Sequence, residues 1–274
     1  MSNDQGIYRL LQRHLDKQPI GFPAALGGSD IRVLRRLFTP DEAKVALQLS
    51  YRPASIDQIA SKTVHEFSAA KTESLLDSMF RKGAIGWRET NKIDQWFLLP
   101  LVVGMYEAAQ DGDPRPEFLA DAWAYMKTVS FAKAFIHAKP SQMRTIPINK
   151  SISVSHPIAT YNQIREIIKS APGPFVALKC ICREKMALRG KPCVKTSRKE
   201  TCFAMNSVAA MVLRRGHGRE INRDEAIELF RQSDSQSEQV HRVRPLCSDL
   251  SGQGHQSERE TAGNSSPKNR RRTL

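Results

Sequence analysis

The chain has 274 residues, a length that favours two compact domains plus extra segments and allows a substantial core. Hydrophobic residues make up 40% and charged residues 26%, values that exclude collagen-like, mucin-like and wholly disordered chains. The net charge of +14 is unusual and favours an anionic partner: nucleic acid, a membrane surface or an anionic cofactor.

The N-terminal residues 1–30 are predicted to form an amphipathic helix, with apolar positions from Ile7 to Leu15, followed by a turn. This segment carries charged residues and has no uninterrupted apolar run, so we predict no secretory signal. The longest apolar run, Phe97 to Tyr106, contains Pro100 and is about half the length that a spanning helix needs. We therefore predict a cytoplasmic chain without a membrane span.

Residues 31–137 have the element order of a winged-helix-like domain with a helical extension. Helix-start signals of the capping-box type precede two helices, at Thr39 and Ser55, and a third helix follows Ser68 and stops at Gly83. Two short strands follow, Ala84 to Arg88 and Gln95 to Leu99. The extension is predicted as one helix beginning at Pro100 and a longer one from about Glu117 to His137.

The second half is predicted to be a linker, a cysteine-rich domain and a tail. The linker covers residues 138–156, with a possible strand at Thr145 to Ile148, and residues 233–274 are polar enough to be disordered. The domain, residues 157–232, should contain one strand and three helices: a helix at Tyr161 to Ser170, a strand at Phe175 to Cys182, and helices opening at Cys202 and at Asn222 or Arg223. The whole fold is expected to be α+β and mostly helical.

Four of the five cysteines lie between Cys180 and Cys202, a spacing that indicates metal ligands in a reducing compartment. On a strand, Cys180 and Cys182 would share one face. Cys193 would arrive from the turn after Gly190, and Cys202 from the first turn of a helix, whose dipole favours a thiolate. We therefore predict that Cys180, Cys182, Cys193 and Cys202 bind one metal centre.

Zinc and an iron–sulfur cluster both accept four thiolates, and the spacing matches neither zinc knuckles nor bacterial ferredoxins. The surrounding charge favours an iron–sulfur cluster, because residues 183–199 contain seven Lys or Arg and one Glu. Among these, Arg183 and Lys191 are the expected cofactor-binding cations. The alternative without metal is that the cysteines are small buried hydrophobic residues. His217 is expected at a helix end, and Cys247 is expected to take no part.

Several runs resemble a family of iron–sulfur-binding proteins of anaerobic bacteria. They are Cys180 to Glu184, Gly190 to Cys193, Glu200 to Phe203 and Gly218 to Ala226, with Tyr8 to Pro23 and Phe38 to Glu42 further upstream. The resemblance covers about residues 7–232. Its members join a winged-helix-like region to a Cys-x-Cys-Arg segment and a [4Fe-4S] ferredoxin-type domain. The resemblance implies a [4Fe-4S] cluster and electron transfer beside a larger redox enzyme.

The sequence departs from that family after Glu238, where only Cys247 follows in a tail rich in Ser and Arg. The ferredoxin domain is therefore expected to be missing or truncated.

Three classes of function remain to be compared. An iron–sulfur accessory protein would need a redox partner and no catalytic activity of its own. A metal- or redox-responsive DNA-binding regulator is the alternative, but residues 1–110 carry 14 basic against 12 acidic side chains, which disfavours nucleic acid. A hydrolase or transferase is not supported, because the sequence contains no phosphate-binding loop, zinc-protease motif or nucleophile elbow.

Overall fold

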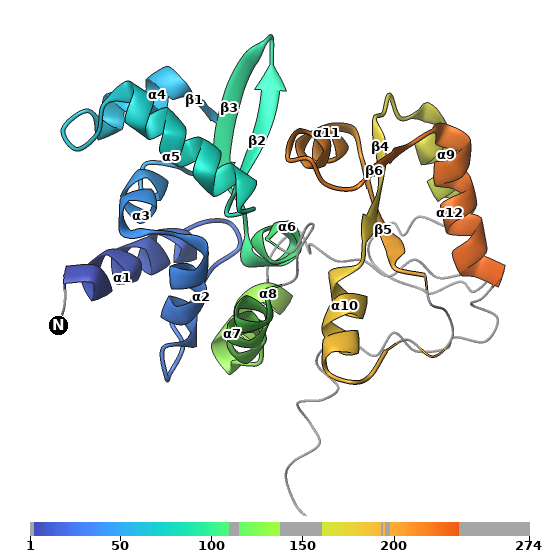
Figure 1. Cartoon of the computed structure of the whole chain (residues 1–274), viewed down its shortest axis with the longest axis horizontal. Coiled ribbons are helices and arrows are strands. Elements are labelled where there is room, and N and C mark those ends of the chain that lie inside the picture. Colours follow the sequence, from blue (N-terminus) through green and yellow to red (C-terminus); the bar gives the residue numbers. More distant parts are fainter. Residues whose placement is uncertain (1–2, 110–114, 138–160, 193, 195–197, 236–274) are drawn as a thin grey trace, which may run out of the picture. The chain divides into compact units, whose positions relative to one another are not determined.

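The computed structural model describes residues 3–109, 115–137, 161–192, 194 and 198–235 (Figure 1). They form an α+β fold that is mostly helical and contains two small three-stranded antiparallel sheets, which confirms the predicted fold class. All described residues belong to one unit, residues 1–241. None of the helices in these ranges is long and apolar enough to span a membrane.

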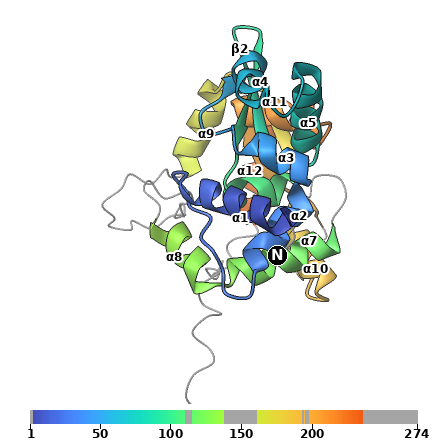
Figure 2. The same ribbon diagram turned by 90° about the vertical axis from the view of Figure 1, so that its left-hand side faces the viewer.

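The first part of the described chain begins with helices and continues into a sheet. Its elements are α1 (Asn3–Asp16), α2 (Ser29–Leu37), α3 (Pro40–Ala46), β1 (Ala54–Ser55), α4 (Ile56–Thr63), α5 (Ala69–Arg81), β2 (Ile85–Thr90) and β3 (Ile93–Leu98). Figure 2 shows α1, α2 and α3 lying side by side. Helix α2 was not predicted; it begins directly after Gly28, which adopts a left-handed conformation with φ 70°.

The predicted helix starts are confirmed by their hydrogen bonds. The Thr39 hydroxyl accepts from the Glu42 N–H at 3.3 Å, and the Glu42 carboxylate accepts from the Thr39 N–H at 2.7 Å. Ser55 and Gln58 form the same reciprocal capping box at the start of α4. Local signals of this kind need no tertiary contact, so the sequence alone was sufficient to place them.

The first sheet has the strand order β1-β3-β2. The predicted hairpin is confirmed, with Trp87 of β2 opposite Trp96 of β3. Asn91 and Lys92 make its two-residue turn with φ values of 53° and 63°. Strand β1 was not predicted; it is two residues long, and it pairs Ala54 with Trp96 on the free side of β3.

Two expectations for the helical extension were wrong. Residues Leu101–Met105 are not a regular helix, because Val102, Val103 and Gly104 have non-helical backbone angles, and only α6 (Tyr106–Ala108) follows. The long helix is two helices, α7 (Pro116–Met126) and α8 (Val129–His137). Thr128 separates them, since its hydroxyl accepts from the Phe131 N–H at 3.3 Å and so starts the second helix.

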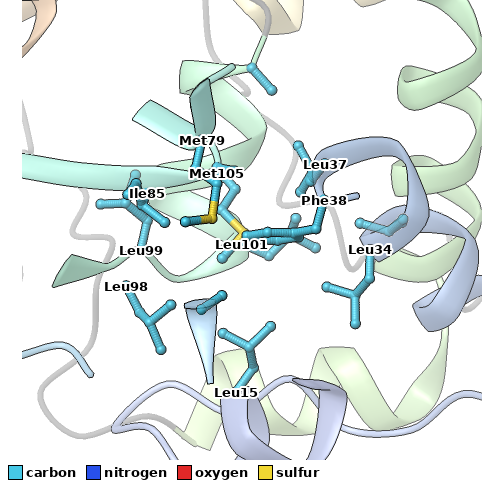
Figure 3. Close-up of a cluster of buried hydrophobic side chains, with 14 of the residues drawn as sticks. Leu15, Leu34, Leu37, Phe38, Met79, Ile85, Leu98, Leu99, Leu101 and Met105 are labelled. Atoms are coloured by element: carbon cyan, nitrogen blue, oxygen red, sulfur yellow. The ribbon is translucent and has the colours of Figure 1, made fainter. Parts of the chain in front are cut away.

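The largest core cluster lies in this first part of the chain. Figure 3 shows members of it from six elements or their flanks: Leu15, Leu34, Leu37, Phe38, Met79, Ile85, Leu98, Leu99, Leu101 and Met105. The same cluster includes Ile181, from the second part of the chain. The segment that carries the first two cysteines is therefore anchored on this core.

The second part consists of a small sheet covered on both faces. Its elements are α9 (Tyr161–Ser170), β4 (Phe175–Lys179), α10 (Ile181–Leu188), β5 (Glu200–Met205), α11 (Asn206–Arg214), β6 (Arg219–Ile221) and α12 (Arg223–Ser235). The strand order is β5-β4-β6 (Figure 1). Phe175 and Ala177 pack toward Ile168 of α9 and Ala226 of α12, whereas Val176 packs toward α11.

The prediction for this part was correct for α9, for the start of β4 and for the start of α12 at Arg223, and it missed α10, β5 and β6. Residues 233–235 belong to α12 instead of the expected disordered tail. The expected linker at 138–156, its possible strand, and tail residues 236–274 lie outside the described residues. The predicted domain boundaries stay predictions.

Candidate metal centre

Cys180 and Cys182 lie at the start of a helix, so the expectation that both belong to a strand was wrong. Strand β4 ends at Lys179, and Cys180 is the N-cap residue of α10. The Cys180 carbonyl accepts from the N–H groups of Arg183 and Glu184, both at 3.0 Å, which commits the following residues to helix. Ile181, between the two cysteines, is buried with 5% of its surface exposed.

Cys202 lies in a strand, so the prediction that it opens a helix was also wrong. It belongs to β5, where it is paired with Leu178 of β4, and α11 begins only at Asn206. The register shifts between Leu178 and Lys179, and the Cys180 N–H then donates to the Lys199 carbonyl at 3.0 Å. This pairing brings Cys202 next to the start of α10.

The thiols of Cys180, Cys182 and Cys202 converge despite these changes of element. Cys180 lies close enough to Cys182 and to Cys202 for its thiol to interact with both. These two neighbours, assisted by the Arg183 backbone N–H, hold the pKa of the Cys180 thiol well below its usual value. Cys180 and then burial raise the pKa of Cys182 and of Cys202. Of the three thiols, Cys180 is therefore the one whose thiolate is favoured.

Cys180 is the shared neighbour within this trio. Among the described residues, no group of three or more His, Cys, Asp or Glu side chains is arranged to hold a metal ion as it stands. The fourth predicted ligand, Cys193, lies outside the described residues, as does Cys247. Sulfur donors suit soft metals and iron–sulfur clusters, and binding would release the protons of the thiols. The donor chemistry thus fits the expected group, and ligation stays a prediction.

The two expected cofactor-binding cations lie in different settings. The Arg183 guanidinium donates to the Arg198 carbonyl at 3.1 Å, while its backbone N–H supports Cys180. Lys191 follows Gly190, whose φ of 69° ends α10, and the Lys191 N–H donates back to the Met186 carbonyl at 2.9 Å. The Lys191 residue is exposed. Their roles toward a cofactor stay predictions.

Two residues of α6 interact with the cysteines and were missed by the sequence analysis. Tyr106 is buried with 4% exposed, and its hydroxyl has no hydrogen-bond partner among the described residues. Burial, followed by Cys182, Glu107 and Cys180, raises the pKa of the Tyr106 phenol. Glu107 in turn contributes to the raised pKa of Cys182 and Cys202. These residues lie far upstream of the cysteines, and no local pattern indicates the contact.

His217 joins none of these groups. It follows Gly216 after the end of α11, and its N–H donates to the Val212 carbonyl at 3.2 Å. Burial and then Arg215 lower the pKa of its imidazole. Its position at a helix end agrees with the prediction.

The chain was compared with protein families, curated proteins and solved structures. No family model, curated protein or solved structure matches it. The resemblance to iron–sulfur proteins therefore stays a prediction that rests on the sequence runs named above.

Proposed function

We propose that this chain binds an iron–sulfur cluster through Cys180, Cys182, Cys193 and Cys202. It would act in electron transfer, as an accessory protein of a redox enzyme and without catalytic activity of its own. The observation that carries the proposal is the convergence of three thiols, two from the start of α10 and one from β5, with Cys180 favoured as a thiolate.

The chain's own residues would hold and tune such a centre. When bound, an iron–sulfur cluster accepts and releases an electron. Ile181 fixes the start of α10 on the core, so that the two neighbouring thiols keep their positions. The Arg183 N–H already supports the sulfur of Cys180, and the Tyr106 hydroxyl is a buried donor without a partner among the described residues. Donors to cluster sulfurs raise the reduction potential.

Iron–sulfur is favoured over zinc by charge. Zinc with four thiolates is a closed structural site that needs no redox tuning. Lys185 is the nearby cation that acts on Cys182. The wider excess of Lys and Arg in residues 183–199 compensates the negative charge of a cluster and would raise its potential.

We further propose that the first part of the chain is a winged-helix-like module that docks to protein. The order α3, β1, α4, α5, β2, β3, with β1 paired to β3, supports this assignment. The cations at the end of α5 are already engaged: Arg81 pairs with Asp77 at 3.7 Å, and Lys82 pairs with the buried carboxylate of Glu42. This leaves α5 less suited to contact phosphates, which argues against the DNA-binding alternative.

The direct test is to replace the cysteines one at a time. We expect Cys180→Ser, Cys182→Ser, Cys193→Ser and Cys202→Ser each to lose bound metal when purified without oxygen, because each removes one thiolate. Cys247→Ser is the matched control and should keep its metal. Metal content is measured by elemental analysis per chain. Full retention of metal by all four variants would overturn the proposal.

A further inference from the structure

Three cationic side chains gather around one indole ring. Lys185 of α10 places its Nζ 3.3 Å from the centroid of the Trp123 ring. Lys127, at the end of α7, and Arg189, at the end of α10, lie 5.1 and 5.6 Å from the same centroid. We call Trp123, Lys127, Lys185 and Arg189 the Trp123 surface. A cation over an indole face is a favourable contact, but three of them around one ring also repel one another.

The positive charge of this surface is not neutralised within the described residues. None of its three cations forms an ion pair with a carboxylate there. Other cations of the fold do form such pairs, for example Arg36 with Asp121. Burial, and then Arg189 and Lys127, lower the pKa of Lys185, and only the Cys182 thiol opposes them. An approaching anion would relieve this repulsion.

The Trp123 surface combines exposed cations with an exposed apolar side chain, as protein-docking sites do, and it lies next to the cysteines. Leu188 lies between the two α10 members in sequence and has 56% of its surface exposed. Arg189 and Lys127 are exposed, so an incoming partner can reach them. Lys185 acts electrostatically on Cys182. A partner that contacts the Trp123 surface would therefore lie close to the thiols.

We propose that the Trp123 surface docks an acidic patch of a partner protein beside the cysteine site. The identification of that partner as a redox protein rests on the proposed function, because electron transfer needs close approach to the centre. Complementary charge steers such encounters and fixes their orientation. Leu188 would supply the apolar contact at the edge of the interface.

Single-stranded nucleic acid fits this surface less well. Proteins that bind it offer free aromatic faces on which bases stack, along a groove lined with cations. Here Lys185 already occupies the Trp123 face at 3.3 Å. The three cations form a compact group around one ring, and a compact group of carboxylates on a partner could pair with them.

The test compares two variants of the full chain that lose the same charge. One carries Lys127→Gln, Lys185→Gln and Arg189→Gln; the other carries Lys17→Gln, Lys62→Gln and Lys71→Gln, three exposed lysines elsewhere in the chain. The probes are a fluorescent glutamate-rich peptide and a random single-stranded DNA. Arg189→Gln against Lys62→Gln repeats the comparison with single exposed positions, in case the triple variant folds poorly.

We expect the first variant to bind the peptide about tenfold more weakly than the unaltered chain, and the second to lose about threefold or less. Equal losses in the two variants would overturn the proposal, because the binding would then reflect net charge alone. A larger loss for DNA than for the peptide would also overturn it, in favour of nucleic acid. Iron is assayed separately: a selective loss of peptide binding in a chain that holds no iron would support the surface and refute the cluster.

Discussion

The two parts of the described chain arrange their polar side chains in different ways. In residues 3–137, buried carboxylates are matched by cations: Asp30 pairs with Arg9 at 2.6 Å, and Glu42 pairs with Lys82. In residues 161–235, the thiols of Cys180, Cys182 and Cys202 lie together, and none of these cysteines is fully buried. The first part also has the large core, whereas the second has two small clusters on either face of its sheet. A domain with so small a core gains little stability from apolar burial, and metal binding by its thiols would add to that stability.

Removal of a bound metal should have the largest effect of the changes predicted here. It should separate the two parts most clearly, because only the second part is expected to lose protection. We expect chelation under reducing conditions to lower the hydrogen-exchange protection of backbone amides in β4 and β5 by about 100-fold or more, because the proposed metal centre would couple metal binding to the folding of this part. Amides of α5 and β3, which belong to the large core, should change little.

Hydrogen exchange read by mass spectrometry resolves the two sets of amides. An equal loss of protection in both parts would mean that the cysteine region is not specifically stabilised by a metal. The comparison between the two parts would then be wrong.

Glu42→Gln tests the paired carboxylate of the first part and should have an intermediate effect. Burial works against the charged form, yet Lys82, Thr39 and Ser78 hold the pKa of Glu42 below its usual value of 4.5. Since the pKa is lowered by folding, the carboxylate stabilises the fold above about pH 4.5, and this stabilisation is lost as the pH falls through the folded-state pKa. We expect a loss of about 1–3 kcal/mol at pH 7.

Urea unfolding at pH 7 and at pH 3 measures this loss, which should shrink at the lower pH. Glu66→Gln is the control, because Glu66 pairs with Lys44 at the surface and such pairs contribute about 0–1 kcal/mol. A Glu42→Gln variant as stable as its control at pH 7 would contradict the account.

The sequence predicted the helix starts of the first part better than the strands of the second. Thr39, Ser55 and Ser68 were placed at helix starts because capping depends on residues three positions away. The run Cys180–Cys182 was misassigned because its apolar composition suits a strand, whereas pairing with β5 and the register shift decide where β4 ends. Glu200–Met205 was missed for the same reason: its strand depends on a tertiary partner.

The candidate site stays a prediction. Cys180, Cys182 and Cys202 lie near one another, but on other elements than those expected, and their joint ligation of a metal is not tested by the structure. Tyr106 and Lys185 were not assigned any part in it individually, because their positions depend on how α6 and α10 pack. Contacts between residues so distant in sequence leave no periodic signal in a single chain.

Tyr106→Phe should have the smallest effect and sharpens the description of the site. Its buried hydroxyl has no partner among the described residues, so its removal should leave the free energy of unfolding of the metal-free protein within about 1 kcal/mol. With the cluster bound, we expect a lower reduction potential, because a donor near the sulfurs is lost. Potentiometric titration of both proteins, matched in iron content, gives the comparison. An unchanged potential would show that the hydroxyl does not reach the sulfurs.

The central claim is that the converging cysteines hold an iron–sulfur cluster. The most direct measurement is the content of iron, zinc and acid-labile sulfide per chain, after expression with ample iron and purification without oxygen. We predict a brown protein with iron and sulfide in equal amounts, whose visible absorption bleaches on reduction. A colourless protein with one zinc per chain and no sulfide would contradict the claim and identify the site as structural.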